Sequence, residues 1–507
     1  FTFLMRQTII NVSREIEFDL KNEIYNHYQS LCSLFYKTNR TGDLMSRITE
    51  DVSKVRMYVG PAIMYSINTI TLFVIVISFM FSISPSLTIY SLIPLPVLSF
   101  TIYRLSKKIH LKSTLVQEYL AKLSTFSQET FSGIKIIKSF NMQKIVTEKF
   151  ENFSISSKNK SVDLSKVQAL FFPLMILLIG ISNIIVIYVG GNQYIEGKIN
   201  IGVIAEFIIY ITMLTWPVAV VGWVTSIIQQ AEASQKRINS FLKSKSSIDN
   251  YGKILNLKSS DIKFKNVSFK YPETNLYALK NINFSIESGK TLGIIGKTGS
   301  GKSTILELIT RSYDVTSGNI YLDSQLLSSY DLKSLKSFIS YVPQNSFLFS
   351  DTIIENIKFG NYSAKDSEVN KVAKDSSIHS DISRFKDEYE TLLGERGVNL
   401  SGGQIQRITI ARALLKKSKI LILDDCLSSV DAKTETSILS NIKKSKKEET
   451  VIIVSHKISS VIHADLIIVL DKGIIIEKGT HNQLLSIDGF YKKLAQKQLE
   501  SIDSIKI

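Results

Sequence analysis

A glycine-rich segment at residues 296–303 has the residue types and spacing of a phosphate-binding loop. It follows a hydrophobic run at 292–295, which predicts a strand, and precedes residues 304–310, which predict a helix. Glycines let backbone N–H groups close around phosphate oxygens, and the helix N-terminus adds positive potential. In this pattern the lysine reaches the β- and γ-phosphates and the last residue ligates Mg²⁺. The segment consists of Gly296, Lys297, Thr298, Gly299, Ser300, Gly301, Lys302 and Ser303.

A second candidate metal ligand stands at the end of another hydrophobic run. Residues 420–423 read Ile-Leu-Ile-Leu, and Asp424 follows them. The run predicts a buried strand, and an aspartate at its carboxyl end can hold Mg²⁺ beside a bound nucleotide. Alone, a hydrophobic run before an aspartate says little. Downstream of a phosphate loop it favours a nucleotide-hydrolysing site.

The sequence at residues 400–404, Leu-Ser-Gly-Gly-Gln, resembles the signature of the ABC transporters. Further segments are similar to the exporter branch of that family, and the resemblance extends over nearly the whole chain. They are residues 35–36 and 41–47, 131–135, 341–344, 349–357, Gly394-Glu395-Arg396-Gly397, 428–431 and 455–456. Residues 35–47 and 131–140 look like the two coupling segments through which exporters pass movements of the ATPase domains to the membrane helices.

The resemblance implies roles for single residues. Gln344 would contact Mg²⁺ together with Ser303 and Asp424, and His456 would contact the γ-phosphate. Tyr271 would stack on adenine. Thr304 is added to the nucleotide site as the residue after the phosphate loop, and Asp431 as part of the D-loop. The signature residues that would close over a partner's ATP are Ser401, Gly402, Gly403 and Gln404.

Electrostatics agrees with that role for the signature. Ser401 and the two glycines after it are predicted to open a helix, whose free N–H groups form a second anion site. One ATP cannot touch both its own phosphate loop and a signature so distant in sequence without a second subunit. The resemblance implies two ATPase domains joined head to tail. The expected ligands are therefore ATP and Mg²⁺, and the expected partner is a second ABC half-transporter.

One position departs from the family pattern. Active sites of these transporters carry glutamate after the strand-ending aspartate, and here that residue is Asp425. Its side chain is one methylene shorter, which withdraws the carboxylate by about 1.5 Å, and a misplacement of about 1 Å can cost on the order of 100-fold in rate. Asp425 is therefore predicted to act as a weak base, although a conservative substitution with activity retained is the alternative. A weak site beside an intact signature resembles one member of the heterodimeric multidrug-type exporters.

Length, hydropathy and charge point to a membrane protein of more than one domain. The chain has 507 residues, 44% of them hydrophobic, and a formal net charge of +16. Lysines flank long uncharged stretches and are not interleaved with the aromatic and arginine clusters that grip bases, so nucleic acid is not expected as a partner. The two cysteines, Cys32 and Cys426, have no metal-ligand spacing and indicate no disulfide framework.

Long uncharged stretches predict four membrane helices. Residues 61–103 hold no charge and can form two spans divided near Ser84-Pro85-Ser86; residues 167–195 form a third. Residues 199–231 form a fourth, interrupted only by Glu206, which is interpreted as a structural or interfacial group in preference to a substrate contact. Basic segments stay on the cytoplasmic side, so residues 1–60, 104–166 and those after about 232 are predicted to be cytoplasmic.

The expected architecture is a helical transmembrane domain of the type I exporter kind, N-terminally truncated, followed by an α/β P-loop NTPase domain of the ABC type. The expected domains are residues 1–235, a linker at 236–260 and an ATPase domain at 261–507. Residues 104–166 are expected to form two cytoplasmic helical arms with a break at Gly133. The resemblance implies six membrane helices per half, so the first and most of the second are expected to precede residue 1.

The predicted function is ATP-driven export by alternating access, in a multi-pass protein of a bacterial plasma membrane with its ATPase domain in the cytoplasm. A hydrophobic drug or a lipid is the favoured substrate, because the spans offer an apolar path with few fixed charges. Peptide export is the nearest alternative. An ATP-gated channel or regulatory protein is a further one, since a weakened carboxylate permits it. Membrane lipid is the remaining expected partner.

Overall fold

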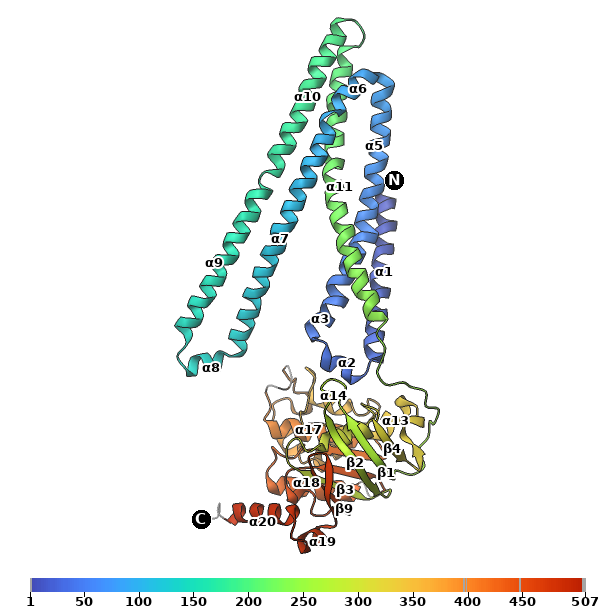
Figure 1. Cartoon of the computed structure of the whole chain (residues 1–507), viewed down its shortest axis with the longest axis vertical. Helices are drawn as coiled ribbons and strands as arrows, with labels where there is room; N and C mark the ends of the chain where they lie inside the picture. Colours follow the sequence, from blue (N-terminus) through green and yellow to red (C-terminus); the bar gives the residue numbers. More distant parts are fainter. Residues whose placement is uncertain (1, 395–396, 398, 446–447, 504–507) are drawn as a thin grey trace. The chain divides into compact units, whose positions relative to one another are not determined.

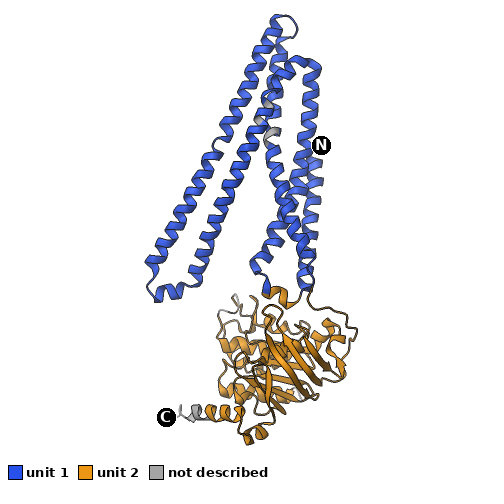
Figure 2. Cartoon of the chain, in the orientation of Figure 1, with its two compact units in different colours: residues 1–31, 38–245 blue, residues 32–37, 246–507 orange. Residues whose placement is uncertain are grey.

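The computed structural model describes residues 2–394, 397, 399–445 and 448–503. Contacts divide the chain into two compact units, drawn in separate colours in Figure 2. Unit 1 holds residues 1–31 and 38–245, and unit 2 holds residues 32–37 and 246–507. The segment Cys32–Lys37 thus groups with unit 2, although the chain before and after it belongs to unit 1.

Unit 1 is built of helices (Figure 1). Two π-helical turns, Arg47–Asp51 and Tyr58–Ala62, interrupt its early part. The helices are α1 (Thr2–Ser30), α3 (Thr41–Ser46), α4 (Val52–Met57), α5 (Ile63–Ile83), α6 (Pro85–Leu92), α7 (Pro94–Ser132), α8 (Ile134–Ser139), α9 (Gln143–Gln168), α10 (Phe171–Ile195) and α11 (Ile201–Leu242).

Three helical runs in the described part of the chain are long and apolar enough to cross a membrane: Thr41–Ile83, Gln143–Ile195 and Ile201–Leu242. They contain three of the four spans expected from the sequence. The remaining one, the second in chain order at about residues 85–103, is divided at Ile93 between α6 and α7. Pro94 and Pro96 lack the N–H group that would continue the α6 hydrogen-bond ladder, so the apolar residues are shared between two helices. That span stays a prediction.

The apolar helices pack along a common buried cluster. Its fully buried members include Met80 of α5, Leu87 of α6, Val186 of α10 and Phe207 of α11. Below them, α7 and α9 lie side by side, with Phe126 against Phe153 at 5.4 Å between ring centroids. The α7 helix ends at Gly133 and α8 begins beyond it, which confirms the predicted break.

An ion pair between the buried carboxylate of Asp51 and the exposed side chain of Arg237 joins the start of α4 to the end of α11. Asp51 is 2% exposed and accepts hydrogen bonds from Ser234 Oγ at 2.9 Å and from the Arg237 guanidinium. A buried carboxylate is stable only when its oxygens are paired in this way. In α11 itself, Tyr210 Oη donates to Glu206 Oε1 at 2.6 Å, which gives the one charged residue of the stretch 199–231 a local partner.

Unit 2 combines two sheets with surrounding helices. One sheet has the strand order β2-β1-β4-β5 and the other β10-β9-β3-β8-β7-β6, in which β9, β3, β8, β7 and β6 are parallel. The strands are β1 (Ile262–Lys270), β2 (Tyr277–Ile286), β3 (Thr291–Gly296), β4 (Ser317–Leu322), β5 (Gln325–Leu326), β6 (Ile339–Val342), β7 (Ile420–Asp424), β8 (Thr450–Val454), β9 (Leu466–Asp471) and β10 (Ile474–Gly479). The helices are α2 (Ser33–Thr38), α12 (Lys302–Ile309), α13 (Leu332–Phe338), α14 (Ile353–Lys358), α15 (Asp366–Asp375), α16 (His379–Ile382), α17 (Gly402–Leu415), α18 (Ala432–Ser445), α19 (His481–Ser486) and α20 (Phe490–Asp503).

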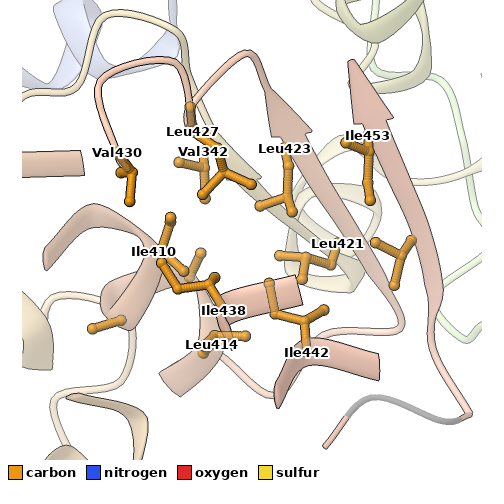
Figure 3. Packing of buried hydrophobic residues seen from close by; sticks show 14 of the residues in the cluster. Val342, Ile410, Leu414, Leu421, Leu423, Leu427, Val430, Ile438, Ile442 and Ile453 are labelled. Carbon is orange, nitrogen blue, oxygen red and sulfur yellow. The ribbon is translucent and has the colours of Figure 1, made fainter. Parts of the chain in front are cut away.

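The parallel strands are buried on both faces because their side chains alternate between two apolar clusters. Ile420 and Ile422 of β7 belong to the cluster that includes α12, whereas Leu421 and Leu423 belong to the one that includes α17 and α18. Figure 3 shows this second cluster, in which Ile438 of α18 packs among the residues below β7. A continuous hydrophobic run is typical of a parallel strand covered on both sides.

The two cysteines lie in different surroundings, both within unit 2. Cys426 is buried and follows β7 directly. Cys32 precedes α2, is partly exposed, and has its Sγ 3.1 Å from Ser247 Oγ. Burial tends to raise the pKa of the Cys32 thiol, but hydrogen bonds from Ser247 and neighbouring groups outweigh it and lower the pKa to about 7.

The packing of α18 against the sheet leads to a test of stability. Ile438→Ala is expected to lower the free energy of unfolding of the ATPase domain by about 2–5 kcal/mol, because it removes a fully buried side chain and leaves a cavity. Thermal unfolding of the full chain measures the effect. Ser437→Ala, at the exposed neighbouring position, is the control and should stay close to wild type. Equal unfolding temperatures for the two variants would contradict this packing.

Candidate nucleotide-binding site

A cavity of about 350 Å³ lies at the carboxyl ends of β3, β8 and β7, which are neighbours in that order in the sheet. Parallel strands bring their carboxyl ends to one edge of a sheet, where nucleotides commonly bind. The cavity brings together eleven of the residues singled out in the sequence and adds Ala278 and Val454. Its lining consists of Tyr271, Ala278, Thr298, Gly299, Gly301, Lys302, Ser303, Thr304, Gln344, Asp424, Asp425, Val454 and His456.

The phosphate loop ends in a conformation that requires glycine. Gly301 has φ +99° and is the N-cap of α12, and a Cβ there would come within 2.7 Å of the Ala278 carbonyl oxygen. The Lys302 ammonium donates to the carbonyl oxygens of Gly296 at 2.8 Å and Lys297 at 2.9 Å. Burial lowers the pKa of Lys302, while Asp425 and Asp424 act in the opposite direction. The loop thus folds around its own lysine, at the start of a helix with free N–H groups.

Asp424 ends β7 and is 4% exposed. Ser303 Oγ donates to its Oδ1 at 3.3 Å, and Tyr341 Oη donates to its Oδ2 at 3.0 Å. Burial raises the pKa of Asp424, and the two hydroxyl donors partly offset that effect. Ser303, Asp424 and Gln344 together offer the hard oxygen ligands that suit Mg²⁺.

Asp425 follows β7 in a left-handed conformation, with φ +44°. Its N–H donates to the Val454 carbonyl oxygen at 2.9 Å, and Gln344 Nε2 donates to its Oδ2 at 3.3 Å. Aspartate visits this backbone region more readily than most residues, because its short polar side chain can bond locally. The side chain reaches the cavity from a turn fixed by β8.

Tyr271 forms one wall of the cavity. Its ring meets Phe269 and Tyr313 edge-on, with centroids 4.9 and 5.5 Å away. Its hydroxyl donates to Glu307 Oε2 at 2.8 Å and lies 2.9 Å from Thr304 Oγ1. Burial raises the pKa of Tyr271 to about 12, so the phenol stays protonated at neutral pH. The ring is therefore held by its neighbours as a fixed aromatic platform.

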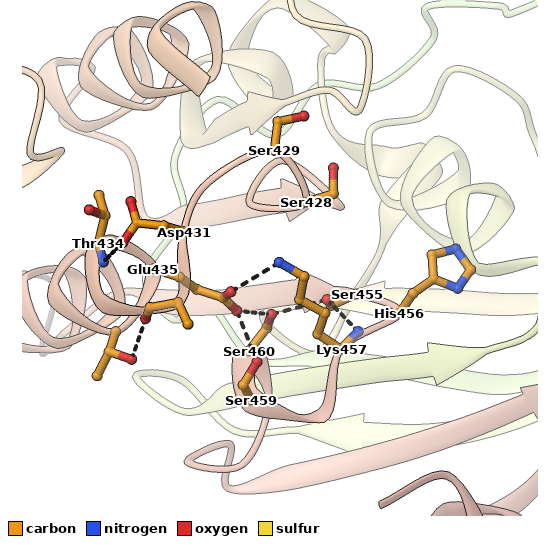
Figure 4. A network of polar contacts seen from close by, with 12 residues as sticks. Ser428, Ser429, Asp431, Thr434, Glu435, Ser455, His456, Lys457, Ser459 and Ser460 are labelled. Atoms are coloured by element: carbon orange, nitrogen blue, oxygen red, sulfur yellow. Dashed lines mark hydrogen bonds and ion pairs between the residues drawn. The ribbon is translucent and has the colours of Figure 1, made fainter. Parts of the chain in front are cut away.

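His456 lines the cavity from a loop that a buried glutamate organises (Figure 4). Glu435 of α18 is 2% exposed and accepts hydrogen bonds from Ser459 at 3.3 Å and from Ser460, and it pairs with Lys457 Nζ at 3.4 Å. Figure 4 shows these bonds and the imidazole of His456 projecting away from them. The carboxylate fixes residues on the carboxyl side of the histidine and thereby the path of its backbone.

The signature segment opens a helix as predicted. Ser401 is the N-cap of α17, and its Oγ accepts from Gln404 N at 3.3 Å while Gln404 Oε1 accepts from Ser401 N at 2.9 Å. Gly403 lies close to the D-loop, where an added Cβ would come within 2.9 Å of the Ser429 carbonyl oxygen.

Several expected site residues lie apart from this cavity. Among the described residues, its lining does not include the signature, Asp431, or three members of the phosphate loop, Gly296, Lys297 and Ser300. Of the segment before the signature, Glu395 and Arg396 lie outside the described residues, whereas Gly394 and Gly397 lie within them.

Comparisons with known proteins agree with this architecture over both units. The family model for the ABC transporter transmembrane region matches residues 1–218, and the family model described as ABC transporter matches residues 279–428. The chain is 37% identical to the multidrug resistance-like ATP-binding protein MdlA of Buchnera aphidicola subsp. Schizaphis graminum, over 98% of this chain and 86% of that protein. This chain belongs to the ABC exporters.

Two other relatives and one solved structure extend the comparison for this ABC exporter half. MdlA of Escherichia coli is 34% identical over 98% of this chain and 85% of its own length. The ATP-dependent lipid A-core flippase of Syntrophus aciditrophicus is 33% identical over 96% of this chain and 81% of its own. The structure of a bacterial Atm1-family ABC exporter with ATP bound superposes with TM-score 0.84 at 25% identity, covering 96% of this chain and 86% of that one.

The chain is thus a membrane-embedded half-transporter that couples an ATPase domain to transport. Sequence reasoning found the local motifs of its site but missed the side chains that support them. Glu307, which supports Tyr271, and Glu435, behind His456, belong to no short motif. Tyr341, which donates to Asp424, lies in the segment 341–344, from which the resemblance assigns a role to Gln344 alone. The apolar spacing around Glu435 in α18 is the one signal that could have drawn attention to it, since a carboxylate on a buried helix face needs partners.

The support of His456 can be tested by Glu435→Gln. The substitution replaces one accepting oxygen of the carboxylate with an NH₂ donor, which faces two serines and a lysine that are themselves donors. The loop after His456 should therefore shift, and the turnover of ATP should fall by roughly tenfold. ATP affinity should change by less than about twofold, since Lys302 and the phosphate loop are untouched. Steady-state hydrolysis and equilibrium ATP binding of the assembled transporter measure the two effects.

Glu448→Gln is the matched control, at an exposed position beyond α18, and should leave both quantities at wild-type values. The unfolding temperature of Glu435→Gln shows whether the variant is folded. A folded variant with unchanged turnover, or with ATP binding reduced as much as turnover, would refute the positioning role.

Proposed function

We propose that this chain is the slowly hydrolysing half of a heterodimeric exporter. It would move a hydrophobic drug or a lipid across a bacterial plasma membrane by alternating access, with its ATPase domain in the cytoplasm. The observation that carries the proposal is Asp425 at the position of the usual glutamate, combined with an intact signature at residues 400–404. The substrate class is supported by relatives named for multidrug resistance and for flipping lipid A-core.

The cavity fits Mg²⁺-bound ATP in size and donor chemistry. Its volume of about 350 Å³ lies within the range of ligand pockets. Tyr271 would stack on adenine, the loop N–H groups and Lys302 would hold the phosphates, and Ser303, Gln344 and Asp424 would hold the metal. The bound metal ion would neutralise charge that develops on the β- and γ-phosphate oxygens. His456 would donate to the γ-phosphate.

Asp425 is the residue that would orient the attacking water. The aspartate side chain is about 1.5 Å shorter than glutamate, and a misplacement of about 1 Å can cost on the order of 100-fold in rate. Its Oδ2 also accepts a hydrogen bond from Gln344 Nε2 at 3.3 Å, which holds the short carboxylate beside a proposed metal ligand. ATP would therefore bind this site and be hydrolysed slowly there.

The signature would act on a second chain. Ser401, Gly402 and Gly403 open α17, a helix of 14 residues, and a helix N-terminus attracts anions. In a head-to-tail dimer they would complete the site of a partner carrying glutamate after its metal-binding aspartate. A homodimer would place Asp425 at both sites, which is why a distinct partner is proposed.

Asp425→Glu tests the role of the short carboxylate. The longer side chain should bring the base to the attacking water and raise ATP turnover of the assembled complex at least fivefold, even though glutamate fits the left-handed backbone at φ +44° less well. Steady-state hydrolysis is the measurement. Asp387→Glu lengthens an exposed carboxylate of the same unit and should change nothing. If Asp425→Glu gave no increase, the geometric argument would fail.

Co-purification tests the partner. A tagged copy of this chain, extracted in detergent from its own host, should bring down a related half-transporter with glutamate after its strand-ending aspartate. A self-paired dimer that hydrolyses ATP rapidly at two equal sites would contradict the proposal. In nanodiscs, hydrolysis stimulated by hydrophobic drugs or lipids supports pumping of that class. Stimulation by peptides alone would favour peptide export, and ion conductance uncoupled from hydrolysis would favour a gate.

A further inference from the structure

A lysine from outside the ATPase sequence reaches the residues behind the proposed adenine platform. Lys37 is the last residue of the segment Cys32–Lys37 that groups with unit 2. Its ammonium donates to Glu307 Oε1 at 2.8 Å and to Tyr313 Oη at 3.2 Å, and it lies 5.1 Å from the centroid of the Tyr313 ring. Three separate interactions therefore place this ammonium.

Glu307 is the centre of the arrangement because its two oxygens face two different partners. Oε1 accepts from Lys37, and Oε2 accepts from the Tyr271 hydroxyl at 2.8 Å. Its side chain is 25% exposed, so both bonds form in a partly desolvated environment. A movement of Tyr271 must reorient the carboxylate, and the carboxylate cannot reorient without changing its bond to Lys37.

The two ends of this chain of contacts have different surroundings. Tyr271 lines the nucleotide cavity, whereas Lys37 and Glu307 are not among the described residues that line it. Lys37 lies in α2, and the polypeptide runs directly from α2 into helices α1 and α3 of unit 1. A signal at the cavity wall can therefore reach a segment that is continuous with the membrane domain.

We propose that Lys37 and Glu307 act as positioning residues. Through them, the docking of α2 on the rest of unit 2 would depend on a purine base stacked against Tyr271. The proposal rests on the proposed adenine-binding role of Tyr271. A stacked base holds the ring, the ring holds the Glu307 carboxylate through its hydroxyl, and the carboxylate holds Lys37. Coupling between two binding events is reciprocal, so Lys37 must also influence the affinity for nucleotide.

The expected effect is moderate. The Lys37 side chain is 49% exposed, and exposed ion pairs contribute little because water and salt screen them. The Glu307 carboxylate also fixes the orientation of the Lys37 ammonium relative to the Tyr271 hydroxyl, because it accepts a hydrogen bond from each. A change of severalfold in nucleotide affinity, smaller at high salt, is the size that this geometry supports.

The test uses the assembled transporter in lipid nanodiscs and two probes, the non-hydrolysable ATP analogue AMP-PNP and inorganic tripolyphosphate, each with Mg²⁺. Lys37→Glu should weaken AMP-PNP binding about fivefold, because two carboxylates then face each other. Tripolyphosphate, which has no base to stack on Tyr271, should bind within about twofold of wild type. Glu307→Lys should also weaken AMP-PNP binding. The double variant with the charges exchanged should recover part of the loss, because it restores the ion pair, although an ammonium at position 307 cannot accept the hydrogen bond that Tyr271 Oη donates to Glu307.

A second measurement follows residues 33–38 by hydrogen exchange. AMP-PNP should slow exchange in this segment of the wild-type protein, whereas tripolyphosphate should not. Lys386→Glu makes the same charge change at an exposed site of unit 2 and should leave both affinities unchanged. The double variant controls for misfolding of the single variants, because affinity can be restored only if the protein carrying both substitutions is folded.

The outcomes separate this proposal from the one it rests on. If Lys37→Glu leaves AMP-PNP affinity unchanged, weakens both probes equally, or is not rescued by the exchange of charges, the coupling is refuted. If Tyr271→Ala fails to weaken AMP-PNP relative to tripolyphosphate, the adenine platform itself is wrong.

Discussion

The nucleotide site depends on parallel strands that are buried on both faces and expose polar groups only at their carboxyl ends. Each hydrophobic run of β3, β7 and β8 supplies side chains alternately to two apolar clusters, which leaves no freedom for the strands to slide. Asp424 and the phosphate loop are therefore delivered to one edge of the sheet. Burial at this edge raises the pKa of the Asp424 carboxyl, the proposed metal ligand, and the hydrogen bonds that Ser303 and Tyr341 donate to its two oxygens partly offset that effect.

The same constraint explains why residues that do not line the cavity, but contact the residues that do, are needed to hold the site in place. The groups that face the cavity sit on loops and strand ends, which cannot hold their own geometry. Glu435 fixes the loop after His456, and Glu307 fixes the hydroxyl of Tyr271. Glu307 accepts hydrogen bonds from Lys37 and Tyr271, which lie far apart in the sequence, whereas the partners of Glu435 all lie within residues 457–460. A change at either is expected to act through the residues that it holds, because neither lines the cavity among the described residues.

The sequence predicted the fold class and the motifs of the site because their signals are local. A phosphate loop between a strand and a helix, a strand-ending aspartate and a helix-opening serine each occupy a few consecutive residues. The pairing of Lys37 with Glu307 joins positions 270 residues apart, and no spacing in a single sequence reports it. Neither did the left-handed backbone of Asp425 have a local signal. The division of the expected span at about residues 85–103 arises from two prolines, whose effect on helix continuity the hydropathy pattern does not register.

The two cysteines give the chain a natural contrast in reactivity. A thiol with a pKa near 7 is about half ionised in neutral buffer, and a partly exposed one can be alkylated, whereas the buried Cys426 is protected. A maleimide dye would therefore attach at Cys32, one residue ahead of α2, without any engineered cysteine. The unmodified protein thus carries its own attachment point for a fluorescent or spin-labelled reporter, between α1 and α2.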